Sequence, residues 1–589
     1  MKKTIIKLLA IVLVAASNYR CVDEFIEAPY EMGLDLEKTF SSAKNAEGTI
    51  ALAYAYMLSA GLPMFTWSPP RMPFATNESF LSGENLCSMY YTYEPALCGN
   101  GMSATGPEML KGAALSDDNF TDNYVYIRHT CVVLENIDKV PDMSVEEKNV
   151  VKGEMKGLLA FRYLEMLKRY GGVPLVDRTL TMTDQMGRAS VQQTIDFILR
   201  LCRESKELMG DHMWSNEWTG RLFKGVILAI EAETLTYAAR PLFNSNAPYL
   251  DMHPDNDLIW LGGYDEQRYR DAIKANLDVI EWGKQNGYVL IKTGNPMEDF
   301  GTAVGTLNSK EILLAYKQNG NGPGESDGIY VNYSPNLQGN NNDIQYRGTS
   351  YETLVQFRKA DGTDQTWPGE TPEPYMTGYY DKAFEMEPRC KVSIFFFGID
   401  PFGNPDDDFW SVSKGWKMYK ADPQQGVGRN MKFWYKAGRR AWFEYPIFRM
   451  AEFYLNLAEC YNAIGDDANA RTYLNEIRTR GGLAAVDYTD QAVLQREIER
   501  EWHVEFYNEG QLYPHARHWK KGHEMIGGPK HAFNFTKNVS GGARTPKEFD
   551  KVSLVPAYTS NYAWFDKMNL SPIVQSEINK GYLVQNPGY

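Results

Sequence analysis

EYPIFRMAEFYLNLAECYNAIGDDANARTYLNEIRTRGGL, residues 444–483, predicts two helices folded back on each other. Apolar residues recur in its first half at the i, i+3, i+4 and i+7 spacing of one helix face. They are Ile447, Met450, Ala451, Tyr454, Ala458 and Tyr461. Gly465 can end this helix in the left-handed conformation, and Asp466 or Asp467 can cap the next. A helical hairpin with so short a turn is the unit of tetratricopeptide-like packing.

Other segments carry matching signals in a fixed order along the chain. KGEMKGLLAFRYLEMLKRYGGVPLV (152–176) precedes the hairpin, and IEREWHVEFYNEGQLYPHARHWKKG (498–522) and LSPIVQSEINKGYLVQNPGY (570–589) follow it. Together with the hairpin they resemble the signature of the SusD/RagB-like family of outer-membrane nutrient-binding lipoproteins of Bacteroidetes. The matching residues of 498–522 are Glu499, Arg500, Glu505, Glu509, Gly510, Arg517 and Trp519. Gln511 and His515 depart from the Arg and Asp of the family pattern.

The resemblance implies a mainly α fold, in which a tetratricopeptide-like helical scaffold carries a loop-rich mixed insert. We expect a signal peptide at 1–20 and a single SusD-like unit at 21–589. Within that unit the scaffold covers about 40–290 and 446–520, the loop-rich ligand face about 61–118 and 291–445, and an irregular C-terminal segment 521–589.

Local helix signals support the scaffold. Helices are predicted at 119–139, 221–240 and 265–286, and KVSIFFFGID (391–400) reads as a short β-like run. Ser144 with Glu147, and Ser190 with Gln193, are capping boxes that begin helices. Gly153, Gly157 and Ala160 form a small-residue seam that lets a neighbouring helix approach closely.

The N-terminus predicts export and anchoring. Lys2 and Lys3 precede an apolar run at 5–16 that is too short to span a bilayer, as in a secretory signal. Cys21 follows at once and is the predicted lipidation site, although Asn18, Tyr19 and Arg20 before it are not the small residues of a typical processing site. The resemblance places the protein on the extracellular face of the outer membrane through this lipid anchor, and Asp23 and Glu24 are similar to the family's export signal.

Composition excludes some partners. The formal net charge of −14 is unfavourable for nucleic acid, because a phosphate backbone requires basic surface patches. Aromatic residues make up 13% of the chain, and many lie in predicted loops rather than on helix faces. The charge is compatible with neutral ligands.

The sequence contains no motif that indicates an enzyme, a metal site or a cofactor. It has no nucleophile elbow and no zinc-protease motif, and its cysteines have no C-x-x-C spacing. Cys131, Cys202 and Cys460 fit as small buried residues, whereas Cys87 and Cys98 could form a disulfide. The run 406–408 could hold calcium or be a solvated acidic loop. Arg449, Glu452, Glu459, Arg478 and Arg480 are predicted to be scaffold residues.

Aromatic residues in loops indicate carbohydrate binding. A sugar ring has an apolar face that stacks on a flat aromatic side chain and a rim of hydroxyls that bonds amides and charged groups. The predicted ligand-binding residues are Trp67, Arg71, Tyr91, Tyr330, Asn332, Tyr333 and Trp367.

We therefore expect a glycan-binding lipoprotein that takes an oligosaccharide or polysaccharide ligand. The resemblance implies delivery to a SusC-like TonB-dependent transporter as partner, with no bond broken. Two alternatives stay open: the same fold binding peptides for uptake, and a secreted glycan hydrolase or lyase.

Overall fold

The computed structural model describes residues 36–59, 78–81, 120–181, 183–319, 347–396, 426–435, 442–537, 549–562 and 564–589. The signal peptide, Cys21, Cys87, Cys98 and the acidic run 406–408 lie outside these residues. In the part that is described, no helix is both long enough and apolar enough to cross a bilayer.

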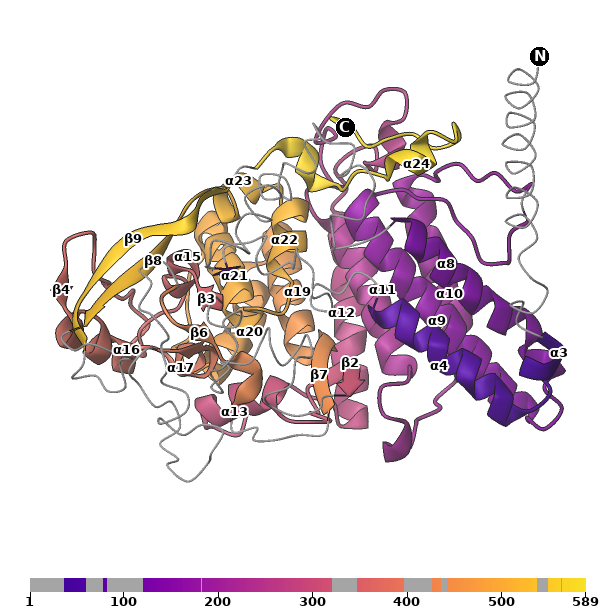
Figure 1. The fold of residues 1–589 in the computed structure, drawn as a ribbon, viewed down its shortest axis with the longest axis horizontal. Coiled ribbons are helices and arrows are strands. Elements are labelled where there is room, and N and C mark those ends of the chain that lie inside the picture. Colours follow the sequence, from indigo (N-terminus) through magenta and orange to yellow (C-terminus); the bar gives the residue numbers. More distant parts are fainter. Residues whose placement is uncertain are drawn as a thin grey trace, which may run out of the picture.

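Helices dominate the fold, as expected. The α-helices are α3 (Leu36–Thr39), α4 (Ala43–Ser59), α8 (Phe120–Asn136), α9 (Val145–Tyr170), α10 (Val191–Met209), α11 (Lys224–Ala239), α12 (Gln267–Asn286), α13 (Pro296–Gly305), α15 (Tyr351–Leu354), α16 (Asp381–Glu385), α17 (Pro388–Ser393), α19 (Met450–Ala463), α20 (Asp467–Arg480), α21 (Gln491–Glu505), α22 (Leu512–His518), α23 (Gly522–Met525) and α24 (Gln575–Ile578). Successive long helices pack on one another from α8 through α12 to α19, α20 and α21 (Figure 1). This stacking is the predicted tetratricopeptide-like scaffold.

Local signals place the scaffold helices as predicted. Both capping boxes form. The Ser144 side chain accepts a hydrogen bond from the backbone N–H of Glu147, and the Glu147 side chain accepts one from the backbone N–H of Ser144. Ser190 and Gln193 bond each other in the same way. A Cβ built on Gly153 would lie 2.3 Å from Met209 Cγ of α10. The seam therefore brings α9 and α10 into close contact.

The hairpin at 444–483 forms from α19 and α20. Gly465 adopts φ +78°, and Asp466 caps α20 by accepting from the backbone of Asn469. Leu474 is fully buried against α19 and α21 in a shared apolar cluster. One detail is wrong: Ile447 lies in a strand before the helix, because residues 442–449 pair with a strand more than a hundred residues earlier.

Short strands cover the mixed part of the chain. They are β1 (Ser79–Leu81), β2 (Ile312–Asn319), β3 (Arg347–Thr349), β4 (Glu373–Pro374), β5 (Ile394–Phe395), β6 (Arg429–Asn430), β7 (Trp442–Arg449), β8 (Gly528–Lys537) and β9 (Phe549–Tyr562). β2 pairs antiparallel with β7, and the other sheets have the orders β1-β3-β6-β5 and β4-β9-β8. Within the described part of the predicted β-like run, residues 391–396, β5 forms a strand directly after α17.

The C-terminal segment is more regular than expected. β8 and β9 pair antiparallel and project with α15, α16 and α17 at the end of the molecule opposite α4 (Figure 1). Alternate residues of β8, Phe533 and Phe535, are buried beside Tyr375 and Tyr379. The hairpin was missed because its apolar alternation is short and interrupted by polar residues.

Scaffold residues predicted from the motifs are indeed buried. Glu452, Arg449 and Arg480 are each 1% exposed, and Glu459 and Arg478 are also buried. Cys131, Cys202 and Cys460 are free thiols in the core, as expected.

Candidate functional site

An aromatic groove lies where α4, β2 and the loop 210–223 meet. It has two lobes that share a wall formed by residues 218–221 with Ala315 and Lys317. The polar lobe has a volume of about 170 Å³ and is also lined by Trp214, Asn286, Tyr288, Asn308, Lys310 and Glu444. The apolar lobe has a volume of about 310 Å³ and is also lined by Glu47, Ile50, Tyr54, Leu58 and Tyr316. We call the whole surface the aromatic groove.

Arg221 holds two tryptophan side chains, Trp218 of the shared wall and Trp214 of the polar lobe. Its guanidinium carbon lies 3.8 Å from the ring centre of Trp214 and 5.3 Å from that of Trp218. Such cation–π contacts orient both rings. The Trp214 ring is fixed further, because its Nε1 donates to the carbonyl of Leu222 at 2.9 Å. Trp218 remains 44% exposed and presents its ring to solvent.

A buried carboxylate positions Arg221 from below. Arg221 Nε donates to Glu154 Oε1 at 2.8 Å, and Nη2 donates to the other oxygen. Tyr54 also donates to Glu154 and accepts from the backbone of Leu222. Burial raises the pKa of Glu154, and Arg221 opposes that shift. α9, α4 and the loop are thus joined under the groove.

Polar side chains close the other side of the polar lobe. Lys317 and Glu444 are register partners on β2 and β7, with 2.9 Å between Nζ and Oε1. Lys317 also donates a hydrogen bond to the side-chain oxygen of Asn308. The backbone N–H of Asn308 in turn donates to the Glu444 carboxylate. Glu444 is 3% exposed, so its carboxylate is covered and satisfied.

Stacked rings form the floor near Tyr288. Phe223, Trp282 and Tyr288 have ring centres 5.4–5.7 Å apart and nearly parallel planes. Gly225 makes this packing possible, because a Cβ there would lie 2.1 Å from the Trp282 ring. The half-buried Tyr288 reaches the lobe from this rigid base.

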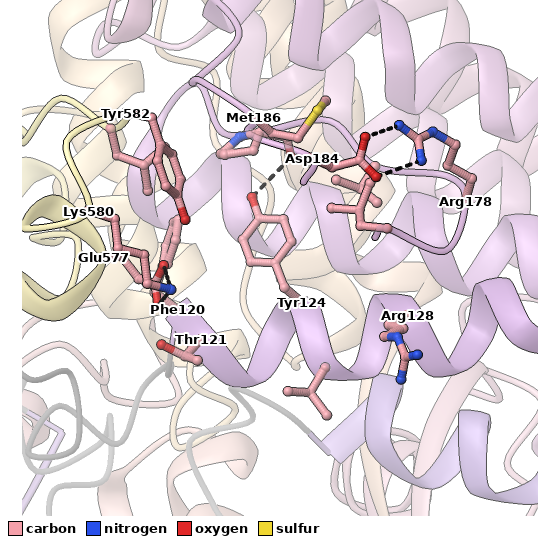
Figure 2. A pocket seen from close by; sticks show the side chains of 15 residues that line it. Phe120, Thr121, Tyr124, Arg128, Arg178, Asp184, Met186, Glu577, Lys580 and Tyr582 are labelled. Carbon is pink, nitrogen blue, oxygen red and sulfur yellow. Dashed lines mark hydrogen bonds and ion pairs between the residues drawn. The ribbon is translucent and has the colours of Figure 1, made fainter. Parts of the chain in front are cut away.

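A second pocket, of about 320 Å³, lies between α8, the segment after α9 and the C-terminal residues (Figure 2). Its charged rim groups are mostly paired: Arg178 with Asp184 at 2.9 Å, and Lys580 with Glu577 at 2.7 Å. Tyr124, between these pairs in Figure 2, donates to the carbonyl of Pro174. Since a sugar needs available polar partners beside its stacking face, the aromatic groove is the better candidate.

The predicted ligand residues fall mainly outside the described part of the chain. Trp67, Arg71, Tyr91, Tyr330, Asn332 and Tyr333 are all there. The elements before them are described: α4 ends at Ser59, and β2 ends at Asn319. Both elements line the aromatic groove close to these ends, through Leu58 and Lys317.

Trp367 is the predicted ligand residue that the structure does describe. It is 6% exposed, and its ring packs against Phe396, Tyr379 and Phe533. The ring faces are covered by protein side chains, so we leave Trp367 out of the proposed site. Its loop position suggested exposure, but the neighbouring strands β5 and β8 bury it.

Sequence reasoning missed Trp214 and Trp218. They lie in GDHMWSNEWTG (210–220), an irregular stretch between two helices with glycine at both ends. The criterion of aromatic residues in loops could have found this segment.

No group of three or more His, Cys, Asp or Glu side chains is arranged to hold a metal ion in the described ranges. The groove's own carboxylates are bonded to Arg221 and Lys317. Its chemistry is therefore stacking and hydrogen bonding.

Comparison with known proteins identifies the fold. A SusD-like protein from Bacteroides fragilis is 24% identical, with a TM-score of 0.71, and the match covers 95% of this chain and 99% of that one. A SusD-like carbohydrate binding protein from the same species is 17% identical, with a TM-score of 0.62 over 92% and 99% of the chains. A SusD superfamily protein from Bacteroides vulgatus is 14% identical, with a TM-score of 0.60 over 93% and 100%.

A search of curated proteins finds no match. Residues 310–589 match the sequence profile of the SusD family. The matched region includes the hairpin and both C-terminal signature segments, and the structural likeness extends over nearly the whole chain. Residues 310–589 therefore match the SusD family, and the chain has the SusD-like fold.

Proposed function

We propose that this protein is a cell-surface lipoprotein that captures oligosaccharides and delivers them to a SusC-like TonB-dependent transporter. The aromatic groove is the observation that carries the proposal. It combines an exposed Trp218 ring with amide and charged groups, the two features that sugar binding requires. The SusD-like carbohydrate binding protein from Bacteroides fragilis, which shares the fold, supports the choice of ligand.

Binding would occur without chemistry. The C–H face of a sugar ring would stack on Trp218, held in place by Arg221, while hydroxyl groups bond Asn308 and Lys317. Stacking depends on shape and not on charge, which suits a protein of net charge −14. Because cargo must be released to a transporter, we expect micromolar to millimolar affinity, or roughly −8 to −4 kcal/mol.

Calorimetric titration with a panel of oligosaccharides tests this function. We expect Trp218→Ala to weaken binding about tenfold or more, since a stacked ring contributes on the order of 1–3 kcal/mol. Tyr264→Ala is the matched control, because Tyr264 is 49% exposed but does not line the groove. Equal binding by both variants would place the site elsewhere. Binding of peptides and of no glycan would keep the fold and reject the cargo, and release of reducing ends would indicate a hydrolase.

The anchor is a separate part of the proposal. Cys21 follows the apolar run 5–16 after four residues and precedes an acidic start, as in the family. We expect Cys21→Ala to release the protein from the outer membrane without unfolding it. Fractionation of cells that express the variant measures this, and continued recovery with outer membrane would contradict lipidation at Cys21.

A further inference from the structure

The two lobes of the aromatic groove differ in their chemistry. α4 contributes apolar side chains such as Ile50 and Leu58 to one lobe. The other lobe receives Asn286, Asn308 and Lys310 from the turns that flank β2 and follow α12. A ligand that spans the shared wall therefore meets a stacking surface on one side and polar groups on the other.

Charges in the groove are compensated except at one position. Arg221 is neutralised by Glu154 and approached by Glu47 at 3.4 Å, and Lys317 is neutralised by Glu444. Lys310 is exposed, and its Nζ lies 5.2 Å from the ring centre of Tyr288. Among the residues that the structure describes, Lys310 forms no ion pair.

Hydrogen-bond donors dominate what the polar lobe offers to a ligand. The only carboxylate among its described lining residues, that of Glu444, is 3% exposed and already accepts from Lys317 and the Asn308 backbone. Lys310 Nζ and Asn308 Nδ2 have no hydrogen-bond acceptor within the described ranges. These two exposed donors, an ammonium group and an amide that line the same lobe, match the acceptor oxygens of an anion.

From these contacts we infer that the polar lobe recognises an anionic substituent on the captured oligosaccharide, a carboxylate or a sulfate ester, through Lys310. The inference rests on the proposed function and narrows its ligand to acidic glycans. Trp218 and Tyr288 would hold the sugar rings, and Lys310 would select the substituent. The selectivity comes from one local charge, although the whole chain is acidic.

Two matched pairs of ligands test the inference and distinguish its two sources of charge. Tetragalacturonic acid is compared with its methyl ester, and a sulfated galactan tetrasaccharide with its desulfated, neutral form. We expect the anionic member of at least one pair to bind about three- to fivefold more tightly, as for an exposed charge pair. Added salt should reduce this preference.

Variants assign the preference to Lys310. Lys310→Gln should abolish it, whereas Lys310→Arg should retain it. Lys284→Gln is the control, because Lys284 is also exposed but does not line the groove. Equal affinity within both pairs, or a preference that survives in Lys310→Gln, would overturn the inference and leave the proposed function standing. If no glycan of either kind binds, the proposed function itself fails, and the inference falls with it.

Discussion

Glu452 and Glu233 bring two carboxyl groups together inside the scaffold. They are 1% and 2% exposed. Burial, and then the charge of Glu233, raises the pKa of Glu452 well above its ordinary value, and the charge of Lys168 only partly opposes this shift. Asn456 donates to Glu233 at 2.6 Å and keeps that carboxylate bonded. The protonated form of Glu452 is therefore more favoured in the folded protein than in the unfolded chain.

A raised pKa predicts that stability falls as the pH rises. Unfolding lets Glu452 ionise above its ordinary pKa of about 4.3, so its favourable contribution is present below that pH and is lost as the pH climbs toward the folded value. Glu452→Gln, which mimics the protonated group, should become increasingly more stable than the wild type above about pH 4.3, by at most about 1.4 kcal/mol per pH unit. Denaturant unfolding at a series of pH values measures the difference, and a difference that does not grow with pH would contradict this protonation state.

Glu505 is the opposite case. Burial alone would raise the pKa of Glu505, but Arg480, Arg449 and Arg389 around it lower that pKa to about 2. Its contribution to stability is therefore present above the unfolded pKa of about 4.3 and lost as the pH falls toward 2. Glu505→Gln leaves buried arginines without this charge and should cost about 3–5 kcal/mol at pH 7. The loss should shrink below pH 4, so the two variants should show opposite pH dependences in the same unfolding experiment.

At the scale of elements, the close approach of α9 to α10 determines how a glycine-to-alanine substitution affects stability. A Cβ on Gly153 would lie 2.3 Å from Met209 Cγ and 3.0 Å from the carbonyl oxygen of Ser205. On α4, a Cβ on Gly48 would meet nothing within 4 Å. Alanine is the better helix former at both positions, by about 0.5–1 kcal/mol.

The two glycines should therefore respond with opposite signs. Gly48→Ala should raise the melting temperature, whereas Gly153→Ala should lower stability by about 1–3 kcal/mol, because the Ser205 backbone cannot move aside. Thermal unfolding of the two variants measures this. An increase in melting temperature for Gly153→Ala would show that α10 does not pack on the seam.

Elements with local signals could be predicted, and those without could not. Ser144 and Ser190 begin their helices through hydrogen bonds to residues three positions later in the chain. Gly465 ends the α19 helix because it adopts a positive φ angle. Ile447 fits a helical stripe equally well, but its segment is held by β2, far away in the sequence. β8 and β9 depend in the same way on pairing with each other. Periodicity reports only what a segment prefers by itself.

Across the whole molecule, one buried charge network joins the mixed insert to the scaffold. Arg389 of α17 donates to Glu501 of α21 at 2.7 Å, and Lys432 donates to Glu509. Arg449, at the start of α19, bonds Glu509 as well. In Figure 1, α19 and α21 lie between the stacked N-terminal helices and the end of the molecule that holds α17 and the β8–β9 hairpin. This network explains why residues that match the family signature, such as Glu505 and Glu509, have a structural role.

The site was less predictable than the fold. The criterion of aromatic residues in loops applies to Trp218, but the groove around this residue forms only where α4, α9 and β2 meet beside the loop. Arg221 and Glu154, which hold the ring, come from segments 67 residues apart. Trp367 shows that the same criterion can fail, because this loop residue is buried by strands that are distant in the sequence.

A crystal structure with the tightest-binding oligosaccharide of the panel tests the central claim most directly. We predict a sugar ring against Trp218, with further units in the lobe lined by Asn308 and Lys310. A ligand bound instead in the pocket between Tyr124 and Tyr582, or anywhere that leaves the aromatic groove empty, would contradict the account.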